Sequence, residues 1–436
     1  EEKFSDALRD FERVELGDVS EEEARKVANE ARIEFKSFDG TIGSLFLGLD
    51  AMRIRFEREP EECKILLRVL KLLHDAEIFL PRKSLVEEIY RRKLEKDRIS
   101  ASMSVESALE RLERNSFIFV LKLKEFQVIR ERHESYLDFT GYSASVDDFH
   151  WLKGILVELK DAEGLFCLGN AFCYRELFER GIECYDESLK LKKYAGSYNN
   201  RGIAYAELNE HKRAIEDFSK AIELNRDFAE AYYNRGIAYA KLNEHERAIK
   251  DYDKAIKLNP NLAGAYNNRG LAYAKLNEHE RAIEDFSKAI ELNPDYTEAY
   301  YNRGVAYAEL NKHERAIKDY NKAIELNPNL AEAYGNRGIA YSEIHRYEES
   351  ARDLKKAGIL FLHSGREEDA VKAFYICFRL RDKIENDDIV YCGLALSLLT
   401  SDADVMNELR EVRIQDENLR TILELAMRKL RNEDIS

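Results

Sequence analysis

Five stretches of this chain are near copies of one another at a spacing of 34 residues. The copy around Gly236 runs YYNRGIAYAKLNEHERAIKDYDKAIKLNP, and Gly202, Gly270, Gly304 and Gly338 occupy the same place in the other copies. A chain with such a period has no single globular core, because each copy packs against its neighbours. Its function is therefore expected on the extended surface that the stack presents.

Each copy has the pattern of two amphipathic helices. Residues 232–242 and 248–255 place apolar or small side chains at helical spacing, and Asn243 marks the turn between the two helices. The small Gly236 lies where two helices must approach closely, and large aromatics such as Tyr252 fill the gaps between them. The pattern resembles the tetratricopeptide repeat, whose signature has an aromatic residue, Gly, Tyr, Ala, Phe or Tyr, Ala and Pro at the same offsets.

Weaker copies flank the five regular ones. One contains Gly169 and is one residue out of period, and another contains Gly358, which follows Gly338 by only 20 residues. Residues 346–363 contain no proline and no inter-repeat turn, so we expect one helix there to serve two successive repeats. The predicted fold class is mainly α: a right-handed tetratricopeptide superhelix, or α-solenoid, of about seven repeats.

The first 140 residues differ in kind from the repeats. A helix is expected to begin after Pro60, followed by two further helices and by two β-rich pieces at residues 117–124 and 126–132. This order resembles a winged helix-turn-helix. Its third helix offers Arg111 and Arg114 but also three glutamates, and residues 61–140 contain 16 Lys and Arg against 15 Asp and Glu. A DNA reader needs phosphate-neutralising side chains, so this module is predicted to contact protein instead.

The order of the modules resembles the C-terminal half of STAND-type signalling NTPases. In that family a P-loop core and a helical lid precede a winged helix, and a repeat array senses the ligand. LGDVSEEEARKVANEA and FDGTIGSLFLGLDAM, both within residues 1–59, are similar to lid helices of that family. The resemblance implies an NTPase domain upstream of Glu1 and a protein or peptide ligand for the repeats. The expected segments are a lid-like segment at 1–59, the winged helix at 60–140, a linker helix at 141–161, the repeats at 162–380 with 195–357 the regular ones, and C-terminal capping helices at 381–436.

Composition and motifs narrow the function further. A formal net charge of -15 with a pI of about 5.3 makes the chain a poor binder of nucleic acid. No apolar stretch reaches ~18 residues, no signal peptide is present, and the six cysteines form no C-x-x-C pair, which together predict a cytoplasmic protein without membrane contact. No G-x-x-x-x-G-K-[ST] loop and no nucleophile–base constellation is present, so we expect neither catalysis nor a cofactor.

Two rows of residues recur at the repeat period. Histidines stand at each inter-helix turn, but packed helices are ~8–10 Å apart, too far for imidazoles of successive repeats to share a metal ion whose ligands lie ~2.0–2.1 Å away. We therefore expect a structural role for that row, and for the acidic runs at 147–150 and 385–388 a role as loops or helix caps. The histidines are His211, His245, His279 and His313.

The second row consists of asparagines two residues before each repeat glycine. In tetratricopeptide proteins this face lines the concave groove, where an asparagine often bonds the backbone of an extended ligand. An amide both donates and accepts hydrogen bonds, so a ladder of amides suits main-chain recognition. The same row would also suit a structural role in tying one repeat to the next. The predicted groove residues are Asn200, Tyr233, Asn234, Asn268, Tyr301, Asn302, Asn336, Ile237, Leu271 and Val305, with Asn199 and Asn267 between the tyrosines.

An arginine precedes each repeat glycine, and an aspartate follows that arginine by sixteen residues. A partly buried guanidinium needs a carboxylate partner, so we expect an ion pair between the two helices of every regular repeat. The predicted pairs are Arg201 with Asp217, Arg235 with Asp251, Arg269 with Asp285, Arg303 with Asp319, and Arg337 with Asp353.

Three functions remain open from the sequence alone. The first is the ligand-sensing, scaffolding part of a STAND-type NTPase, the second a stand-alone tetratricopeptide adaptor, and the third a DNA-binding regulator. Self-association of the repeats into a homo-oligomer is also open. The groove lacks a lysine cluster and has apolar residues after the glycine, where many peptide-binding members have asparagine, so capture of a terminal carboxylate is not expected.

Overall fold

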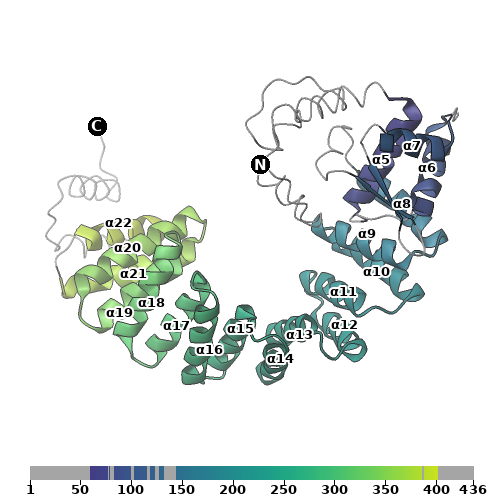
Figure 1. Cartoon of the computed structure of the whole chain (residues 1–436). Coiled ribbons are helices and arrows are strands. Elements are labelled where there is room, and N and C mark those ends of the chain that lie inside the picture. The colour runs from purple at the N-terminus through teal and green to yellow at the C-terminus, as the bar shows by residue number, and fades with distance from the viewer. Residues whose placement is uncertain are drawn as a thin grey trace, which may run out of the picture. The chain divides into compact units, whose positions relative to one another are not determined.

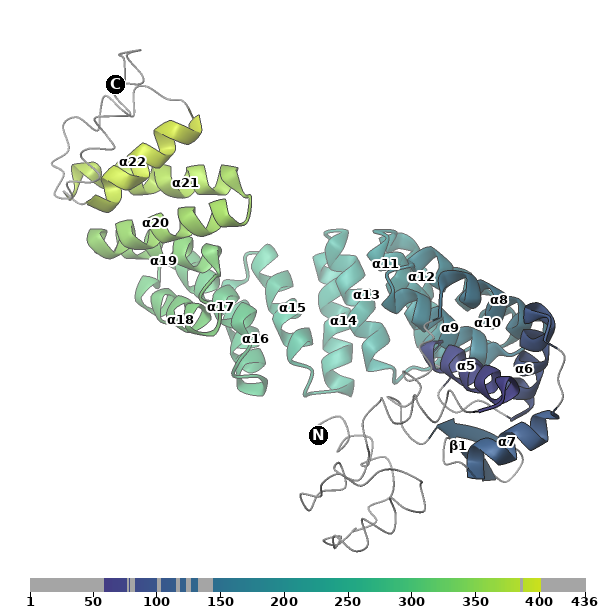
Figure 2. The ribbon, with the colours of Figure 1, turned by 90° about the horizontal axis from the view of Figure 1, so that it is seen from above.

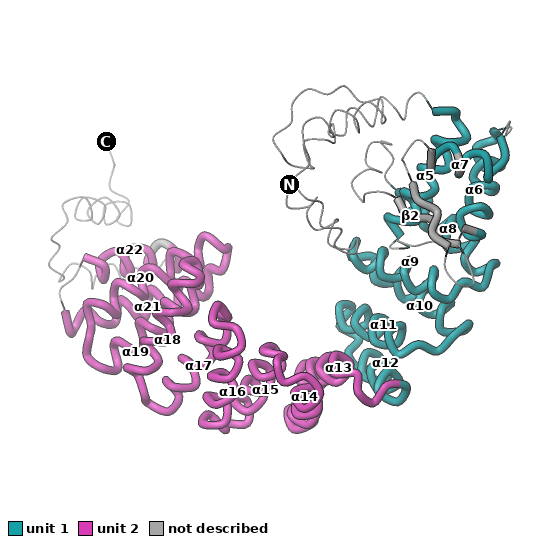
Figure 3. The backbone as a smooth tube through the Cα atoms, in the orientation of Figure 1, with its two compact units in different colours: residues 1–224 teal, residues 225–436 magenta. Residues whose placement is uncertain are grey.

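The computed structural model describes residues 59–76, 78, 83–99, 103–114, 118–122, 127–131, 144–384 and 387–400. They belong to two compact units, residues 1–224 and residues 225–436, which are described separately (Figure 3). Residues 1–58 of the lid-like segment expected at 1–59, and residues 401–436 of the capping region expected at 381–436, lie outside the described residues.

The described part of unit 1 begins with three helices and two strands in the order that the sequence predicts (Figure 1). The strands pair antiparallel, with Ile118 opposite Glu131. Pairs of helices from the repeats come next along the chain. The elements are α5 Glu61–Asp75, α6 Lys83–Asp97, α7 Val105–Arg114, β1 Ile118–Lys122, β2 Gln127–Glu131, α8 Val146–Glu158, α9 Ala162–Tyr174, α10 Phe178–Leu191, α11 Ala195–Glu207 and α12 His211–Leu224.

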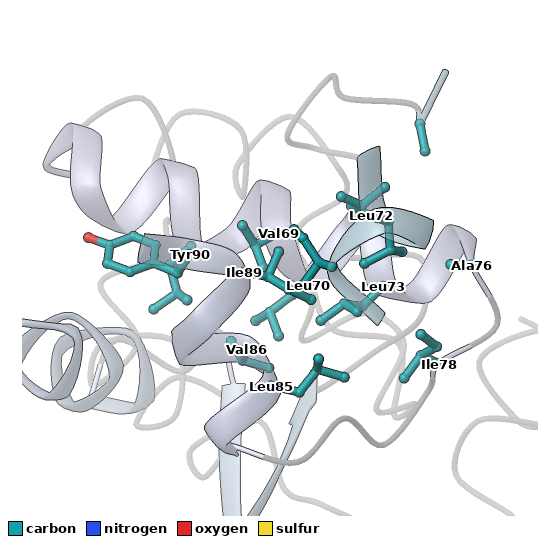
Figure 4. Close-up of a cluster of buried hydrophobic side chains, with 14 of the residues drawn as sticks. Val69, Leu70, Leu72, Leu73, Ala76, Ile78, Leu85, Val86, Ile89 and Tyr90 are labelled. Carbon is teal, nitrogen blue, oxygen red and sulfur yellow. The ribbon is translucent and has the colours of Figure 1, made fainter. Parts of the chain in front are cut away.

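A single apolar core joins α5–α7 to the next helices along the chain. Val69, Leu70 and Leu73 of α5 face Val86 and Ile89 of α6 (Figure 4). The same cluster of buried side chains continues through α7 into α8, α9 and α10. The N-terminal helices therefore form one packed body with the first repeats of unit 1.

Polar contacts reinforce this junction. Arg92 on α6 forms an ion pair with Glu158 at the end of α8, at 2.5 Å between Nη1 and Oε2. The Lys96 ammonium lies 4.8 Å from the centre of the Trp151 ring on α8. The carboxylate of Asp75, at the end of α5, accepts a hydrogen bond from the Ala144 backbone N–H at 3.0 Å. Each of these contacts ties the α5–α7 body to α8.

The acidic run at residues 147–150 is the start of a helix. Ser145 caps α8: its hydroxyl accepts from the backbone N–H of Asp148, and the Asp148 carboxylate accepts from the backbone N–H of Ser145. This reciprocal capping box satisfies donors that would otherwise be unpaired at the first turn. The expectation of a helix cap is confirmed here. In the second acidic run, Asp387 and Asp388 open α22.

Unit 2 is a stack of helix pairs, each packed against the next (Figure 2). Its elements are α13 Ala229–Lys241, α14 His245–Leu258, α15 Ala263–Lys275, α16 His279–Leu292, α17 Thr297–Glu309, α18 His313–Leu326, α19 Ala331–Glu343, α20 Tyr347–His363, α21 Glu367–Phe378, the 3-10 turn η2 Arg379–Asp382, and α22 Asp387–Thr400.

The shared helix that the sequence predicts is present. α20 is 17 residues long, whereas the second helices of the regular repeats have 14. It packs against α19 on one side and against α21 on the other. Gly358 within α20 meets the Phe374 ring of α21, as four of the five repeat glycines meet an aromatic ring of their own second helix; Gly338 meets Leu354 instead.

Two local features set the geometry of each repeat. A Cβ on Gly236 would lie 2.6 Å from the Tyr252 ring, so only glycine allows α13 and α14 to pack this closely. Asn243, between the two helices, adopts a φ of 61°, a left-handed conformation that asparagine tolerates better than most residues. The matching turns in the other regular repeats also have positive φ, at Asn209, Asn277, Asn311 and His345.

All five predicted arginine–aspartate pairs form. Each guanidinium donates from Nε and Nη2 to the two oxygens of one carboxylate, at 2.6–2.8 Å between nitrogen and oxygen. The carboxylates are buried and the guanidinium groups are mostly covered, so the pairing replaces hydration that burial removes. Burial alone would lower the pKa of Arg269, but its bonds to Asp285 raise that pKa above the usual arginine value.

In at least four repeats the same arginine also binds the second helix of the preceding repeat. Nη1 donates to Asp253 at 2.5 Å from Arg269, to Ser287 at 3.0 Å from Arg303 and to Asn321 at 2.6 Å from Arg337. In unit 1, Arg201 donates to Asp186 in the same way. One side chain therefore links three helices and couples each repeat to its predecessor.

Candidate protein-binding surface

The first helices of the repeats present one continuous line of side chains. On α13 this line consists of Tyr233, Asn234, Ile237 and Lys241. Ile237 follows Asn234 by three residues and Tyr233 by four, and Lys241 follows Ile237 by four, so these side chains line one side of the helix. The corresponding residues of α15, α17 and α19 lie beside them, since side chains of neighbouring first helices hydrogen-bond to one another. We call these residues of α13, α15, α17 and α19 the first-helix surface.

The asparagine row connects successive repeats. Asn268 donates from Nδ2 to the Tyr233 hydroxyl at 3.1 Å, Asn302 to the Asn267 amide oxygen at 3.1 Å, and Asn336 to the Tyr301 hydroxyl at 3.0 Å. In unit 1, Asn200 donates to the Asn170 amide oxygen at 3.0 Å. The row thus has the structural role that the sequence left open. Each amide nitrogen has a second hydrogen, so these contacts do not exhaust what it can donate.

The structure places Asn199 and Asn267 below the surface. They are 5% and 3% exposed, and each donates to the next asparagine along the chain, at 3.1 Å to Asn200 and at 3.3 Å to Asn268. The ten predicted groove residues are all partly or largely exposed. Burial of Asn199 and Asn267 means that, in their repeats, these side chains orient neighbouring amides.

Tyrosine alternates with asparagine or glycine three residues before the repeat glycine. The half-buried Tyr233 ring lies 6.1 Å from the Tyr252 ring, between centroids, and its hydroxyl would be 2.9 Å from a Cβ on Gly264 of the next repeat. The pKa values of Tyr233 and Tyr301 are both raised, and burial is the largest cause in each case. Both hydroxyls therefore stay protonated and can donate a hydrogen bond at neutral pH.

The exposure of the aliphatic side chain that follows each repeat glycine depends on this alternation. Leu271 and Ile339 are 37% and 40% exposed, and the residues four places earlier are Asn267 and Gly335. Ile237 and Val305 follow a tyrosine at that distance and are only half-exposed. The first-helix surface therefore has exposed apolar contacts in every second repeat.

The charge of this surface changes sign along unit 2. The position five residues after the glycine holds Lys241 and Lys275 in the first two repeats and Glu309 and Glu343 in the next two, and all four are exposed. Within the part of the chain that the structure describes, none of the four forms an ion pair. The surface can therefore offer a ligand both signs of charge.

The histidines of the row lie at the start of each second helix and are partly buried. The Nδ1 atoms of His211, His245, His279 and His313 are inaccessible, and they have no hydrogen-bond partner among the described residues. Over those same residues, no group of three or more His, Cys, Asp or Glu side chains has the arrangement of a metal site.

Some contacts were not predicted from the sequence. Arg247 stacks 4.0 Å from the Tyr239 ring centre and donates to its hydroxyl at 2.6 Å, and Arg281 repeats this arrangement on Tyr273. Near the N-terminus of the described residues, Arg111 of α7 pairs with the carboxylate of Glu59 at 2.7 Å. Recurrence of arginine and tyrosine eight residues apart was the signal in the sequence that would have revealed the stacked pairs.

Comparison with known proteins assigns the regular helix pairs. The family described as Tetratricopeptide repeat matches residues 229–262, 263–296, 297–330 and 319–351, and one described as TPR repeat matches residues 202–243. These helix pairs are tetratricopeptide repeats. The matched residues, 202–351, include part or all of each of the five regular copies, so the fold class inferred from the 34-residue period, a tetratricopeptide α-solenoid, is confirmed.

Several known proteins resemble the array. Dynein axonemal assembly factor 4 of Pan paniscus is 30% identical over 173 residues, or 39% of this chain and 40% of that protein. The protein of the same name from Rattus norvegicus is 29% identical over 139 residues, or 32% and 33%. The chain thus spans only about a third to two-fifths of these relatives.

Solved structures also match in part. The crystal structure of MamA is 31% identical and covers 38% of this chain and 97% of MamA, with a TM-score of 0.36. The structure of YrrB, titled as a TPR protein with an unusual peptide-binding site, is 27% identical and covers 44% and 97%, with a TM-score of 0.37. Separately, none of the helices described in this chain is long and apolar enough to cross a membrane.

Proposed function

We propose that this chain is a protein–protein interaction scaffold whose first-helix surface binds a polypeptide segment. The observation that supports this most directly is the combination of half-buried tyrosines, oriented amides and exposed aliphatic side chains on one line of helices. Apolar area supplies affinity for such a ligand, and amides with spare donors suit its main-chain carbonyls. The similarity to proteins named dynein axonemal assembly factor is in keeping with a role in protein contacts.

The chain's place within a larger protein is the second part of the proposal: a ligand-sensing part of a STAND-type NTPase. Two observations support it. Three helices and a strand pair precede the repeats in the expected order, and the α5–α7 body shares one core with α8–α10. Such a joint would transmit a change in the repeats to a neighbouring domain, because packed elements move together. A stand-alone tetratricopeptide adaptor fits the repeats equally well.

A DNA-binding role is less well supported. Arg111, one of two basic side chains expected on the third helix, is held by the Glu59 carboxylate, and α6 directs Arg92 and Lys96 to α8. These groups are occupied within the chain. We therefore propose that this module of α5–α7, β1 and β2 contacts protein. Tight binding of duplex DNA at ~0.15 M salt, lost in Arg111→Ala, would contradict this.

The binding proposal can be tested without knowing the natural partner. A display library of random 16-residue peptides would be selected on the full chain and then measured against Leu271→Ser/Ile339→Ser. Removal of two exposed aliphatic side chains should weaken selected peptides at least tenfold, or ~1.4 kcal/mol. The control is Lys250→Ser/Lys318→Ser, at exposed positions on second helices. Selection of no peptide, or equal binding by both variants, would contradict the proposal.

The NTPase context is tested by the coding sequence upstream of Glu1 and by nucleotide binding. With no phosphate-binding loop of the P-loop form, the chain alone should bind ATP no tighter than millimolar. A phosphate-binding loop encoded upstream, together with ATPase activity that changes when a selected peptide is added, is the expected result. A start codon immediately before Glu1, with no such domain encoded upstream, would favour the stand-alone adaptor.

A further inference from the structure

A cavity in unit 1 opens between α9, α10 and α11, separate from the first-helix surface of unit 2. Its volume is about 470 Å³, within the ~300–1,000 Å³ of pockets that hold ligands. Asn170 and Tyr174 of α9, Tyr185 of α10, and Ile203 and Glu207 of α11 are among the residues that line it. The cavity lies where the irregular repeat around Gly169 meets the first regular repeat.

The floor of the cavity is a set of oriented amides. The Asn170 amide oxygen accepts from the Tyr185 hydroxyl at 2.7 Å and from Asn200 Nδ2 at 3.0 Å, which occupies both of its lone pairs. The Asn200 oxygen in turn accepts from Asn199 Nδ2 at 3.1 Å. No described residue accepts from Asn170 Nδ2, so the floor has amide N–H groups to donate. A carbonyl oxygen is the matching group on a ligand.

The walls of the cavity are apolar and exposed. The Tyr174 side chain is 80% exposed and Ile203 is 39% exposed, although both are large hydrophobic residues. An apolar group seated between them would remove area from water on both sides, at roughly 25 cal/mol per Å² buried. Tyrosine supplies such contact area with few rotatable bonds, which suits it to recognition.

The charge at the cavity favours one class of ligand. Glu207 lines the cavity and is exposed, and among the described residues it has no ion-pair partner. Its carboxylate would repel a terminal carboxylate but attract an ammonium or guanidinium group. An amide floor combined with one carboxylate therefore fits a peptide's main-chain carbonyl next to a basic side chain.

We propose that this cavity is an anchor pocket for an extended polypeptide. It takes an apolar side chain between Tyr174 and Ile203, its Asn170 amide donates to the carbonyl of that residue, and Glu207 pairs with an adjacent lysine or arginine. This inference rests on the proposed function and adds a defined sequence preference, apolar followed by basic, at a place outside unit 2.

The chain contains its own attachment points for a test. Cys173 lines the cavity, whereas Cys167 lies on the same helix, does not line it and is also partly exposed; neither is in a disulfide. The full chain would be equilibrated under mildly reducing conditions with two probes. Each probe is a dipeptide, acetyl-Leu-Lys or acetyl-Leu-Glu, joined to cysteamine whose sulfur is in a disulfide, so that a cysteine thiol of the chain can exchange with it. Mass spectrometry would then measure how much of each probe is attached at each cysteine.

The Lys probe should exceed the Glu probe at Cys173 by roughly tenfold, and Cys167 should show no preference. Glu207→Lys should reverse the preference at Cys173. Glu343→Lys, the same substitution four repeats later in unit 2, should leave it unchanged. Equal labelling of Cys173 by the two probes, or an unchanged preference in Glu207→Lys, would overturn the inference.

The peptides selected for the first-helix surface separate this inference from the function on which it rests. If Leu271→Ser/Ile339→Ser lowers their affinity but the Cys173 probes show no preference, the polypeptide-binding proposal stands and the anchor pocket is wrong. If the probes discriminate as expected and the aliphatic variant is silent, the pocket stands and the surface in unit 2 is not the binding site.

Discussion

The helices α5–α9 of unit 1, which we call the N-terminal body, and the regular repeats are stabilised by different interactions. In α5–α9 the buried side chains are mainly Leu, Ile, Val and Phe, and they form one cluster that runs through six helices including α10. In α13–α19 most buried side chains are alanines, aromatics and the ion-paired aspartates, and the apolar clusters are small and local. One region depends on a shared core, and the other depends on contacts repeated every 34 residues.

This difference has a physical consequence for unfolding. A shared core makes its helices lose stability together, whereas a stack of repeats behaves as a sum of units and of contacts between neighbours. A single substitution should therefore act on the whole N-terminal body in the first case, and on one repeat and its neighbours in the second.

The largest effect is expected from breaking one ion pair of the ladder. Asp285→Ala leaves the Arg269 guanidinium largely covered and without its bidentate partner, which should cost about 4 kcal/mol of local stability. Hydrogen exchange should show lost protection in α15 and α16 and little change in α5. Replacement of both partners by apolar residues, Arg269→Met/Asp285→Leu, should recover most of the loss. Equal loss in single and double variants would show that charge pairing is not the cause.

The shared core should respond to the removal of one side chain over a longer range. Leu66 is 0% exposed within the cluster, so Leu66→Ala should cost about 3 kcal/mol through lost burial and the cavity left behind. We expect protection against hydrogen exchange to fall in α8 as well as in α5, while α15 and α16 are unaffected. Loss confined to α5 would contradict a single cooperative body.

Two glycines should respond to alanine with opposite signs. Gly236→Ala places a methyl group 2.6 Å from the Tyr252 ring, and overpacking of this kind costs about 2 kcal/mol. Gly154, in the middle of α8, has nothing within 4 Å of its added Cβ, so Gly154→Ala should stabilise by about 0.5–1 kcal/mol through helix propensity. Chemical denaturation of the two variants checks the signs. A Gly236→Ala variant that is no less stable would rule out close helix approach as the reason for Gly236, and a less stable Gly154→Ala variant would contradict the expected gain in helix propensity.

The smallest expected loss of stability concerns pH. Burial alone would raise the pKa of Asp75, but the His74 imidazole, 3.9 Å away, and hydrogen bonds from Lys71 and the Ala144 backbone N–H hold it at about 2. A carboxyl with a depressed pKa stabilises the fold above its unfolded pKa of ~3.9 and loses that contribution as pH falls toward 2. Stability of the N-terminal body should therefore drop by about 1–2 kcal/mol between pH 4 and pH 2. Asp75→Asn should remove most of this dependence, and an unchanged pH profile would show that another group is responsible.

The sequence predicted the repeats well because their contacts are local and recur. Gly236 against Tyr252 and Arg269 against Asp285 each join residues sixteen apart, so every copy of the pattern is a separate observation of the same contact. The second partner of each arginine, on the preceding repeat, was not predicted because its identity changes from aspartate to serine to asparagine between repeats. All three are short polar residues, which is the pattern that would have revealed them.

The candidate sites were harder to predict, because exposure depends on neighbours in the next repeat. Asn267 and Asn268 are adjacent and chemically identical, yet one is buried and the other is partly exposed. The cavity at Glu207 depends on how an irregular repeat meets a regular one, and no periodic pattern describes that joint. The core between α5 and α8 likewise joins residues too far apart in sequence for spacing to show them.

The double use of α20 restricts how the array can change length. Whole 34-residue copies can be added or removed among α13–α18 with each helix keeping its own neighbours. α20 instead contacts both neighbours: its Leu354 meets Gly338 of α19, and its Gly358 meets Phe374 of α21. Since each residue inserted in a helix turns the remainder of that helix by ~100°, any insertion there would rotate α21 away from its place relative to α19. Whole repeats can therefore be duplicated before α20 in the chain, but residues cannot be inserted within α20. This makes α20 the fixed end from which the array can be extended.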